Sequence, residues 1–424
     1  MEKRKTVFFY TKFYCLTVFV CLILLIAGTF VPQSRVDIYV QESSDIMIEE
    51  GCYPRIVDYT YGSRLDNWTD ALILSSSKAM SNTDFASVLT NPLYGEGEDP
   101  VERLYHYAHN DNLEPTGFYS RYWMGFRWVM RFALAFANYY QLKRYLAFFL
   151  FALFSSVISL IAQKVNIKTA LSFAVSILLV RPYIICNSVQ FSICFVIAFL
   201  AMLCIPWVDR NPKYEKLFFM EVGMITMYFD FYTTPIITLG LPLVFLYVMK
   251  ANKNTPMKCR DVFADAFVWF AAYVAMWITK LILTSALTSL NSVDDGFASL
   301  FGWLGVNPNY QANEQYNAFY ALGGVAYSLI SDREGFKIAA VIALLGIVST
   351  VILAIRKKIN RKQLLEDKAL LLVGLLPIVW FVVASSPTAV HFWFQYRSIA
   401  MTFWAIAAYL SLIFEKDRKN RISP

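Results

Sequence analysis

Two carboxylates four residues apart are the first groups along the chain whose spacing could support chemistry. They are Asp66 and Asp70, in the stretch that begins at Arg64 and has Trp68 between the two acids. In a helix, residues four apart lie on one face. Such a pair can hold a divalent cation, or one carboxylate can act as a general base. The alternative is an N-capping aspartate followed by an ordinary first turn of helix, which the spacing alone favours.

A second polar group follows in the same part of the chain. His106 and His109 are followed directly by Asn110, Asp111 and Asn112. These side chains could bind a polar ligand, and the alternative is a polar surface turn. The sequence has no Cys and His spacing typical of zinc sites, no Gly-rich phosphate loop and no zincin motif. Soluble-type hydrolase and nucleoside-triphosphate chemistry therefore lack support.

Ionisable residues inside or beside apolar stretches form a third set. The set comprises Arg181, Asp230, Lys280, His391 and Arg397, the last of which directly follows Tyr396. A charged side chain at the middle of a bilayer costs about 2.5–3.5 kcal/mol on insertion scales, so such residues usually face a cavity or a partner. For a single Arg or Lys near a helix end, snorkelling to the interface is an equal alternative. All five lie on the outer side in the topology described below, which favours a binding site.

The composition explains why a membrane is the reference for these residues. Of 424 residues, 57% are hydrophobic and 16% are charged, whereas average soluble domains have about 25% charged residues. The aromatic share of 17% suits a protein with many interfacial aromatic belts. These values predict an all-α, polytopic integral membrane protein of the cell membrane. The net charge of +7 lies almost wholly in one set of loops, and it indicates orientation in a lipid bilayer, with no nucleic-acid partner.

Apolar runs long enough to cross a bilayer recur along the chain. A transmembrane helix needs about 20 predominantly apolar residues. We predict about ten such helices, at residues 7–31, 145–162, 169–185, 189–207, 217–232, 235–249, 262–285, 336–355, 369–386 and 398–414. The first run follows a basic start, but it is longer than the apolar core of a secretory signal. We therefore predict an uncleaved first helix.

The distribution of Lys and Arg orients these helices, because short cytoplasmic loops carry the positive excess. With the N-terminus inside, the basic segments 164–168, 209–216, 250–260, 356–368 and 416–421 are all cytoplasmic, and the acidic loop 287–335 is outside. Both the N-terminus and the C-terminus are therefore predicted to be cytoplasmic. A further span at 123–142 would invert every later loop. Ser120, Arg127, Arg131 and Asn138 form one stripe at helical spacing there, so we predict an amphipathic helix in the outer interface.

The predicted organisation has four parts. Residues 1–31 are the cytoplasmic N-terminus and first transmembrane helix, and residues 32–144 are a large extracytoplasmic loop with interfacial helix. Residues 145–414 form a nine-helix transmembrane region, and residues 415–424 are a basic cytoplasmic tail. No internal repeat is visible, which counts mildly against transporter folds built from duplicated halves.

This order of elements resembles the GT-C superfamily of multi-pass membrane glycosyltransferases, and it makes a GT-C-like fold the expectation. Those enzymes also have one helix, then a long outside loop with acidic residues and interfacial helices, then many further helices. The stretches 66–72, 122–126, 230–240 and 391–397 are similar to a group of uncharacterised multi-pass membrane proteins of Firmicutes. The second similarity covers most of the chain and implies no established activity.

The resemblance implies an inverting transfer of a sugar from a polyprenyl-phosphate donor at the outer face to a cell-envelope polysaccharide or glycolipid. It also implies a base or metal ligand in the first outside loop, which here would be Asp66, favoured narrowly, or Asp70. Cations suit the donor phosphate, and aromatic rings suit the faces of a sugar. The candidate substrate-binding residues are Arg64, Trp68, His106, His109, Tyr122, Trp123, Arg181, Asp230, Lys280, His391, Tyr396 and Arg397.

Other function classes stay open at this point. A transporter or flippase of lipid-linked saccharides would use the same groups, but it needs polar residues on both sides of the midplane, and in the inner halves Glu221 is the main one. A multi-pass polysaccharide polymerase is typified by a large late outside loop with arginines, and the loop 287–335 has one Arg. A non-catalytic membrane protein is the third alternative. The sugar, the acceptor and any divalent cation are left undetermined.

Overall fold

The chain folds almost wholly into helices, in agreement with the all-α prediction. The structure is a computed structural model that describes residues 2–57, 61–80, 86–110, 113–303, 317–330 and 367–422. Within these residues, the strands are β1 (Pro92–Leu93) and β2 (Gly117–Phe118), which pair antiparallel with Pro92 opposite Phe118. The predicted span 336–355, Asp111, Asn112 and most of the basic segment 356–368 lie outside the described residues.

Several helices have the length and composition of membrane spans. Five stretches of the described part are long and apolar enough to cross a bilayer: Thr6–Thr29, Tyr139–Lys164, Val189–Arg210, Cys259–Leu287 and Ser385–Ile413. Shorter apolar helices are Ile167–Leu178, Ile236–Asn252, Ala318–Leu329 and Lys368–Val383. The chain is therefore a membrane protein, and the number of ten spans stays a prediction.

The helices of the bundle follow the predicted spans closely. Their bounds are α1 Glu2–Thr29, α7 Tyr139–Lys164, α8 Ile167–Leu178, α10 Val189–Arg210, α11 Glu215–Phe229, α12 Ile236–Asn252, α13 Cys259–Leu287, α18 Lys368–Val383 and α20 Ala400–Ile422. Two further helices, α14 (Ser292–Trp303) and α15 (Ala318–Ile330), lie within the loop predicted at 287–335. That loop therefore contains two helices, and the second of them, α15, is apolar.

The predicted span 169–185 is broken into two helices. The helix α8 ends at Leu178, and α9 (Pro182–Ile185) follows after a turn. Pro182 has no backbone N–H to continue a helix, and a residue before proline is disfavoured in the α region. Arg181 accordingly has a φ of 58°, in the left-handed region. This break directs the chain, and Arg181 with it, toward the interior.

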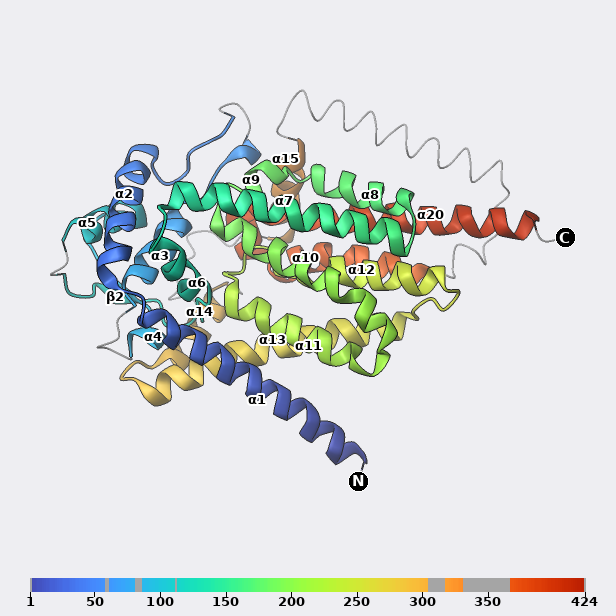
Figure 1. The fold of residues 1–424 in the computed structure, drawn as a ribbon, viewed down its shortest axis with the longest axis horizontal. Coiled ribbons are helices and arrows are strands. Elements are labelled where there is room, and N and C mark those ends of the chain that lie inside the picture. The colour runs from blue at the N-terminus through green and yellow to red at the C-terminus, as the bar shows by residue number, and fades with distance from the viewer. Residues whose placement is uncertain are drawn as a thin grey trace.

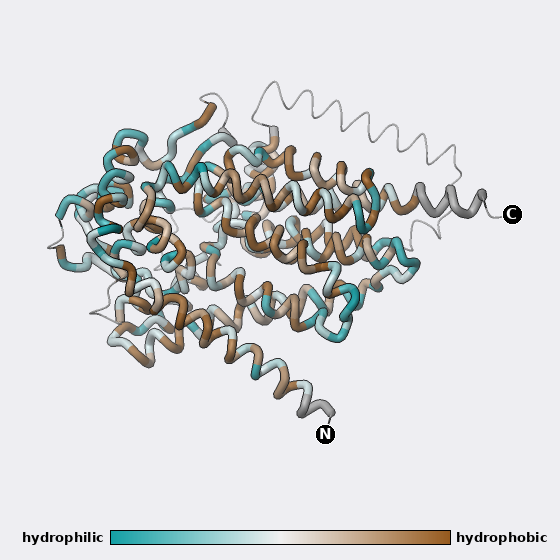
Figure 2. Tube along the Cα trace, in the orientation of Figure 1, coloured by the Kyte–Doolittle hydropathy of each residue, from teal (hydrophilic) through white to brown (hydrophobic). Residues whose placement is uncertain are grey.

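A helical cap sits on one end of the bundle (Figure 1). We use "the cap" for α2 (Gln33–Glu50), α3 (Asn67–Lys78), α4 (Ser87–Thr90), α5 (Pro100–His109) and α6 (Phe126–Leu134), together with β1 and β2. Hydrophilic segments are frequent in the cap, whereas the bundle helices are mainly hydrophobic (Figure 2). Both chain termini lie away from the cap (Figure 1), as expected if the cap is the extracytoplasmic loop.

The predicted interfacial helix is shorter than residues 123–142, and its polar stripe faces the protein. In α6, Arg127 and Arg131 are buried, whereas Val129 and Phe132 are exposed, and Phe136 just beyond is 80% exposed. Each buried guanidinium donates to backbone carbonyl groups of the cap. An outward apolar face with inward cations suits a helix against lipid, because water is not needed to satisfy the cations.

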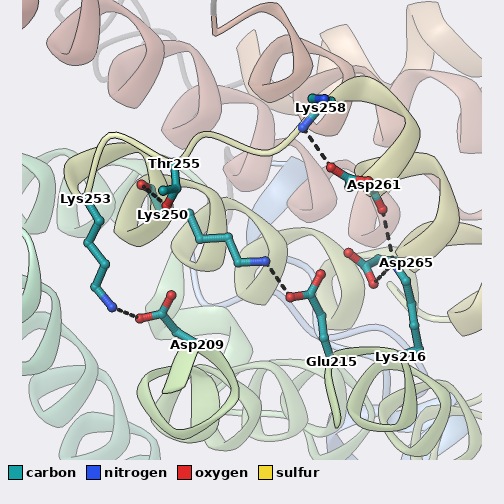
Figure 3. A network of polar contacts seen from close by, with 9 residues as sticks. All are labelled: Asp209, Glu215, Lys216, Lys250, Lys253, Thr255, Lys258, Asp261 and Asp265. Atoms are coloured by element: carbon teal, nitrogen blue, oxygen red, sulfur yellow. Dashed lines mark hydrogen bonds and ion pairs between the residues drawn. The ribbon is translucent and has the colours of Figure 1, made fainter. Parts of the chain in front are cut away.

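Two of the basic segments predicted to be cytoplasmic meet at the end of the bundle opposite the cap. Ion pairs join the adjacent ends of α10 and α11 to the end of α12 and the start of α13 (Figure 3). The pairs are Lys253–Asp209, Lys250–Glu215 and Lys216–Asp265, each at 2.5 Å. Because Glu215 and Asp265 are buried, these contacts fix the two turns against each other. This arrangement agrees with the two segments lying on the same side of the membrane.

The orientation can be tested by labelling two exposed positions, His106 in the cap and Asn254 in the α12–α13 turn. In a chain whose 7 native cysteines are replaced, we expect a membrane-impermeant maleimide to label His106→Cys in intact cells. Asn254→Cys should react only after permeabilisation. Labelling of Asn254→Cys in intact cells would contradict the predicted orientation.

Candidate functional site

Two buried arginines from distant parts of the chain come together next to the cap. Arg181 lies at the break before α9, and Arg397 lies in η3 (Tyr396–Ile399); they are 8% and 1% exposed. Tyr396 lies between them, since its hydroxyl group is 3.0 Å from Nη1 of Arg181 and its ring is 5.0 Å from the Arg397 guanidinium. The Arg397 guanidinium also lies 4.6 Å from the ring of Phe191 on α10.

The hydrogen bonds of Arg397 leave it poorly satisfied. Its Nη1 donates to the carbonyl groups of Trp393 and Phe394 and its Nη2 to that of Gly62, all at 3.4 Å, and its Nε has no partner. These distances are longer than the usual 2.7–3.2 Å of such bonds. Within the described part of the chain, neither Arg397 nor Arg181 forms an ion pair with a carboxylate. Two neighbouring buried cations without counter-charge are costly, and an anionic ligand would remove that cost.

A loop of the cap closes over this arginine pair. The carbonyl of Gly62 accepts from Arg397, and a Cβ atom at Gly62 would collide with the Arg181 guanidinium, so a larger residue there would displace that side chain. Two residues later, the Arg64 guanidinium lies 4.1 Å from the ring of Tyr53 and 5.0 Å from that of Trp393. The structure thus brings together four of the predicted binding residues, Arg64, Arg181, Tyr396 and Arg397. Gly62 carries no sequence signal that would have identified it.

Asp66 is the N-cap of α3, as in the capping alternative drawn from the sequence. Its Oδ1 accepts from the backbone N–H of Thr69 at 3.1 Å, and its Oδ2 accepts from the Thr69 hydroxyl at 2.8 Å. Asp66 is only 3% exposed. Burial, and secondarily the charge of Asp70, raise the pKa of Asp66 to about 7. A carboxyl group that titrates near neutral pH is suited to proton transfer, so the capping role and a catalytic role are compatible at Asp66.

Asp70 instead serves as a cap for another helix. Its two carboxylate oxygens accept from the backbone N–H groups of Val189, at 3.2 Å, and Gln190, at 3.0 Å, which open α10. The Tyr139 hydroxyl, at the start of α7, donates to the same carboxylate. A carboxylate at a helix N-terminus is favourable. These contacts make Asp70 a structural residue here, and Asp66 remains the predicted catalytic carboxylate.

Asp230 lies one turn of α10 away from the arginine pair. Its Oδ1 accepts from Cys194 of α10 at 3.2 Å, and the Arg397 guanidinium lies over the ring of Phe191 on the same helix. Residues three apart on a helix lie on one face about one turn apart. Gln395 also connects the two regions, because its Nε2 donates to the Tyr232 carbonyl at 3.4 Å. His391, predicted as a binding residue, stacks on Phe394 with ring centroids 5.0 Å apart, beside the same region.

Two predicted residues are engaged elsewhere. Lys280 donates to the carbonyl of Leu89 in α4 and, at 2.8 Å, to the hydroxyl of Thr284, and it is fully buried. Trp123 is also fully buried and donates to the Met276 carbonyl at 2.8 Å. These contacts give both residues packing roles, and the phosphate role of Lys280 and the sugar-platform role of Trp123 stay predictions.

The remaining predicted residues are on or near the surface of the cap. His106 is exposed, and His109 lies 3.1 Å from Asp45 on α2. Trp68 is 36% exposed at the start of α3. Tyr122 is half-buried and stacks on Tyr119, with ring centroids 5.1 Å apart. The structure does not bring the two histidines to the arginine pair. Among the described residues, no group of three or more His, Cys, Asp or Glu could hold a metal ion.

Comparison with protein-family models, with curated proteins and with solved structures finds no match to this chain. The GT-C resemblance therefore stays a prediction that rests on the order of elements, and function must be inferred from the site itself.

The capping role of Asp70 can be tested by Asp70→Asn. The amide cannot accept from all three donors, and an unmet buried hydrogen bond costs about 1–3 kcal/mol. We expect a lower Tm of the purified protein in detergent. Asp45→Asn, at a half-exposed acid of α2, should leave the Tm unchanged. An Asp70→Asn variant with the wild-type Tm and no activity would instead indicate a catalytic role.

Proposed function

We propose that this protein is a membrane glycosyltransferase that moves a sugar from a polyprenyl-phosphate donor to an acceptor outside the cytoplasm. The observation that carries the proposal is the buried pair Arg181 and Arg397, which has no carboxylate partner within the described residues. Guanidinium groups bind phosphate oxygens in a planar, bidentate manner. A phosphate group is therefore the ligand that this pair suits best.

The surroundings of the arginine pair support a lipid-linked substrate. The pair sits where the cap meets the bundle, since Arg397 contacts both Gly62, between α2 and α3, and Phe191 on α10, and a polyprenyl-phosphate has its charge at the same kind of boundary. Its tail would lie along the hydrophobic helices, and its sugar would face the cap. Arg181 and Arg397 would hold the phosphate and stabilise the charge that develops on it as it leaves.

Asp66 is the proposed general base. The acceptor hydroxyl would give its proton to the Asp66 carboxylate while the hydroxyl oxygen forms a bond to the anomeric carbon of the sugar. The bond between that carbon and the phosphate oxygen breaks, and its electron pair leaves with the phosphate. In-line attack inverts the anomeric carbon. The base must be deprotonated, so with a pKa of about 7 for Asp66 the rate rises as pH increases through that value.

Substitution of Arg397 tests the phosphate site. Arg397→Ala should lower kcat/KM for a polyprenyl-phosphate sugar by about 10²–10³-fold, as for loss of one donor to a developing negative charge. Arg397→Lys should restore little, because lysine cannot make a bidentate contact. The matched control is Arg127→Lys, at a buried arginine that bonds only carbonyl groups of α4, which should lower Tm without a selective loss of transfer. Full activity of Arg397→Lys would contradict the proposal.

Substitution of Asp66 tests the catalytic step. Asp66→Asn should lower the transfer rate by about 10²–10⁴-fold and abolish the rise of rate with pH near 7, yet retain donor binding. The control is Asp99→Asn, at the N-cap of α5 in the same cap, which should affect stability more than rate. Wild-type transfer by Asp66→Asn would overturn the assignment. Movement of intact lipid-linked sugar across a bilayer by the wild-type protein, without bond cleavage, would favour a transporter.

A further inference from the structure

A second polar cluster, separate from the arginine pair, lies in the chain between α11 and α12. Asp230 is 4% exposed, and its Oδ1 accepts from the backbone N–H of Thr233 at 3.1 Å and from Cys194. Its Oδ2 has no hydrogen-bond partner. Within the parts of the chain that the structure describes, no cationic side chain pairs with this carboxylate. A buried carboxylate without a counter-charge is expensive and calls for a proton or a cation.

Two buried hydroxyl groups adjoin Asp230. Those of Thr233 and Thr234 make no hydrogen bond of normal geometry. The Thr233 side chain interacts with the Asp230 carboxyl, and the Thr234 side chain interacts with Cys194, which contacts the same carboxyl. Gln190, one turn before Cys194 on α10, likewise has a buried Oε1 without a partner. Natural proteins leave few buried polar groups without a well-formed hydrogen bond, so the unpaired Asp230 Oδ2 beside these hydroxyls indicates a ligand.

The local field at Asp230 favours a positive ligand. Asp230 is the C-cap of α11, where the helix dipole adds partial negative charge to that of the carboxylate. The unpaired atoms of Asp230, Thr233, Thr234 and Gln190 are all oxygens. Hard oxygen ligands suit alkali and alkaline-earth cations and not soft metals. Non-helical backbone between two membrane helices is also a usual place for such ions.

We propose that Asp230, Thr233 and Thr234 form a binding site for a monovalent cation, with sodium as the ion tested. A single carboxylate neutralises one positive charge, whereas a divalent cation would leave an excess charge in a buried place. Gln190, four residues before Cys194 on α10, has the nearest further unpaired oxygen along that helix. The half-buried rings of Phe231 and Tyr232 follow Asp230 directly in the chain. Phe231 packs on Phe126 of α6, so the site lies close to the cap end of the bundle. This site does not depend on the proposed glycosyl transfer, and its ion would fix α10 to the α11–α12 turn.

Sodium binding can be measured without any activity. For the purified protein in detergent, we expect Tm to rise and saturate with NaCl at constant ionic strength set by choline chloride, because a ligand of the folded state stabilises it. Direct binding of ²²Na⁺ should saturate in the same range. Asp230→Asn should lose both responses. Thr233→Val combined with Thr234→Val keeps side-chain volume and should weaken sodium binding by about tenfold or more, as for loss of about 1.4 kcal/mol.

The matched control is Thr226→Val, at a buried threonine of α11 that bonds Thr238. It should lower Tm but retain the sodium response and ²²Na⁺ binding. The double threonine variant keeps the test decisive if Asp230→Asn does not fold. Equal stabilisation by NaCl and choline chloride with no ²²Na⁺ binding, or undiminished sodium binding in the double variant, would overturn the proposal. A Tm that depends on pH but not on sodium would show that Asp230 holds a proton instead.

Discussion

The carboxylate of Asp70 is the contact on which the rest of the site depends. It belongs to α3 of the cap, yet its hydrogen bonds go to the first residues of α10 and to Tyr139 at the start of α7. Backbone N–H groups at a helix start have no partner within the helix, and Asp70 supplies one across the boundary between cap and bundle. Since α10 carries both Phe191 and Cys194, this contact also sets where Arg397 and Asp230 lie. The cap is therefore joined to the bundle through hydrogen bonds as well as apolar packing.

Buried cations in this protein fall into two groups that differ in how well they are satisfied. Arg127 and Lys280 donate to carbonyl groups of α4, and Arg131 donates to the carbonyl groups of Ser77 and Lys78 at the end of α3. Cations at helix C-termini are stabilised by the unpaired carbonyl groups and the dipole. Arg127, Arg131 and Arg397 all have an Nε without a partner, but the Nη bonds of Arg397 are all 3.4 Å long. This difference in bond length distinguishes Arg397 from the arginines that hold the cap together, whereas Arg181 donates to the Ser328 carbonyl at 2.7 Å.

The positions of the two polar regions at the ends of the bundle give the molecule a clear polarity. Three close ion pairs lie at the end with the basic turns. At the cap end, Lys78 pairs with Asp37, but among the described residues the arginine pair has no carboxylate partner and Asp230 has no cationic partner. Arg397 and Asp230 contact residues of α10 that are one turn apart, Phe191 and Cys194, and each of these unpaired charges can be satisfied by a ligand of opposite sign. A phosphate at the arginines and a cation at Asp230 would together neutralise the region.

The sequence by itself determined the membrane class, the helical architecture and the large polar segment after the first helix. These follow from composition, from the length of the apolar runs and from the placement of Lys and Arg, because a bilayer imposes the same requirement on each span independently. Sequence reasoning also identified Arg181, Asp230 and Arg397 as unusual, since ionisable residues near a bilayer are expensive wherever they occur. Only the tertiary structure decided which of these residues have partners. Lys280 is satisfied by a carbonyl group 191 residues away in the sequence, and Asp70 by N–H groups 119 and 120 residues away. No local pattern encodes such contacts, because they depend on how the cap docks onto the bundle.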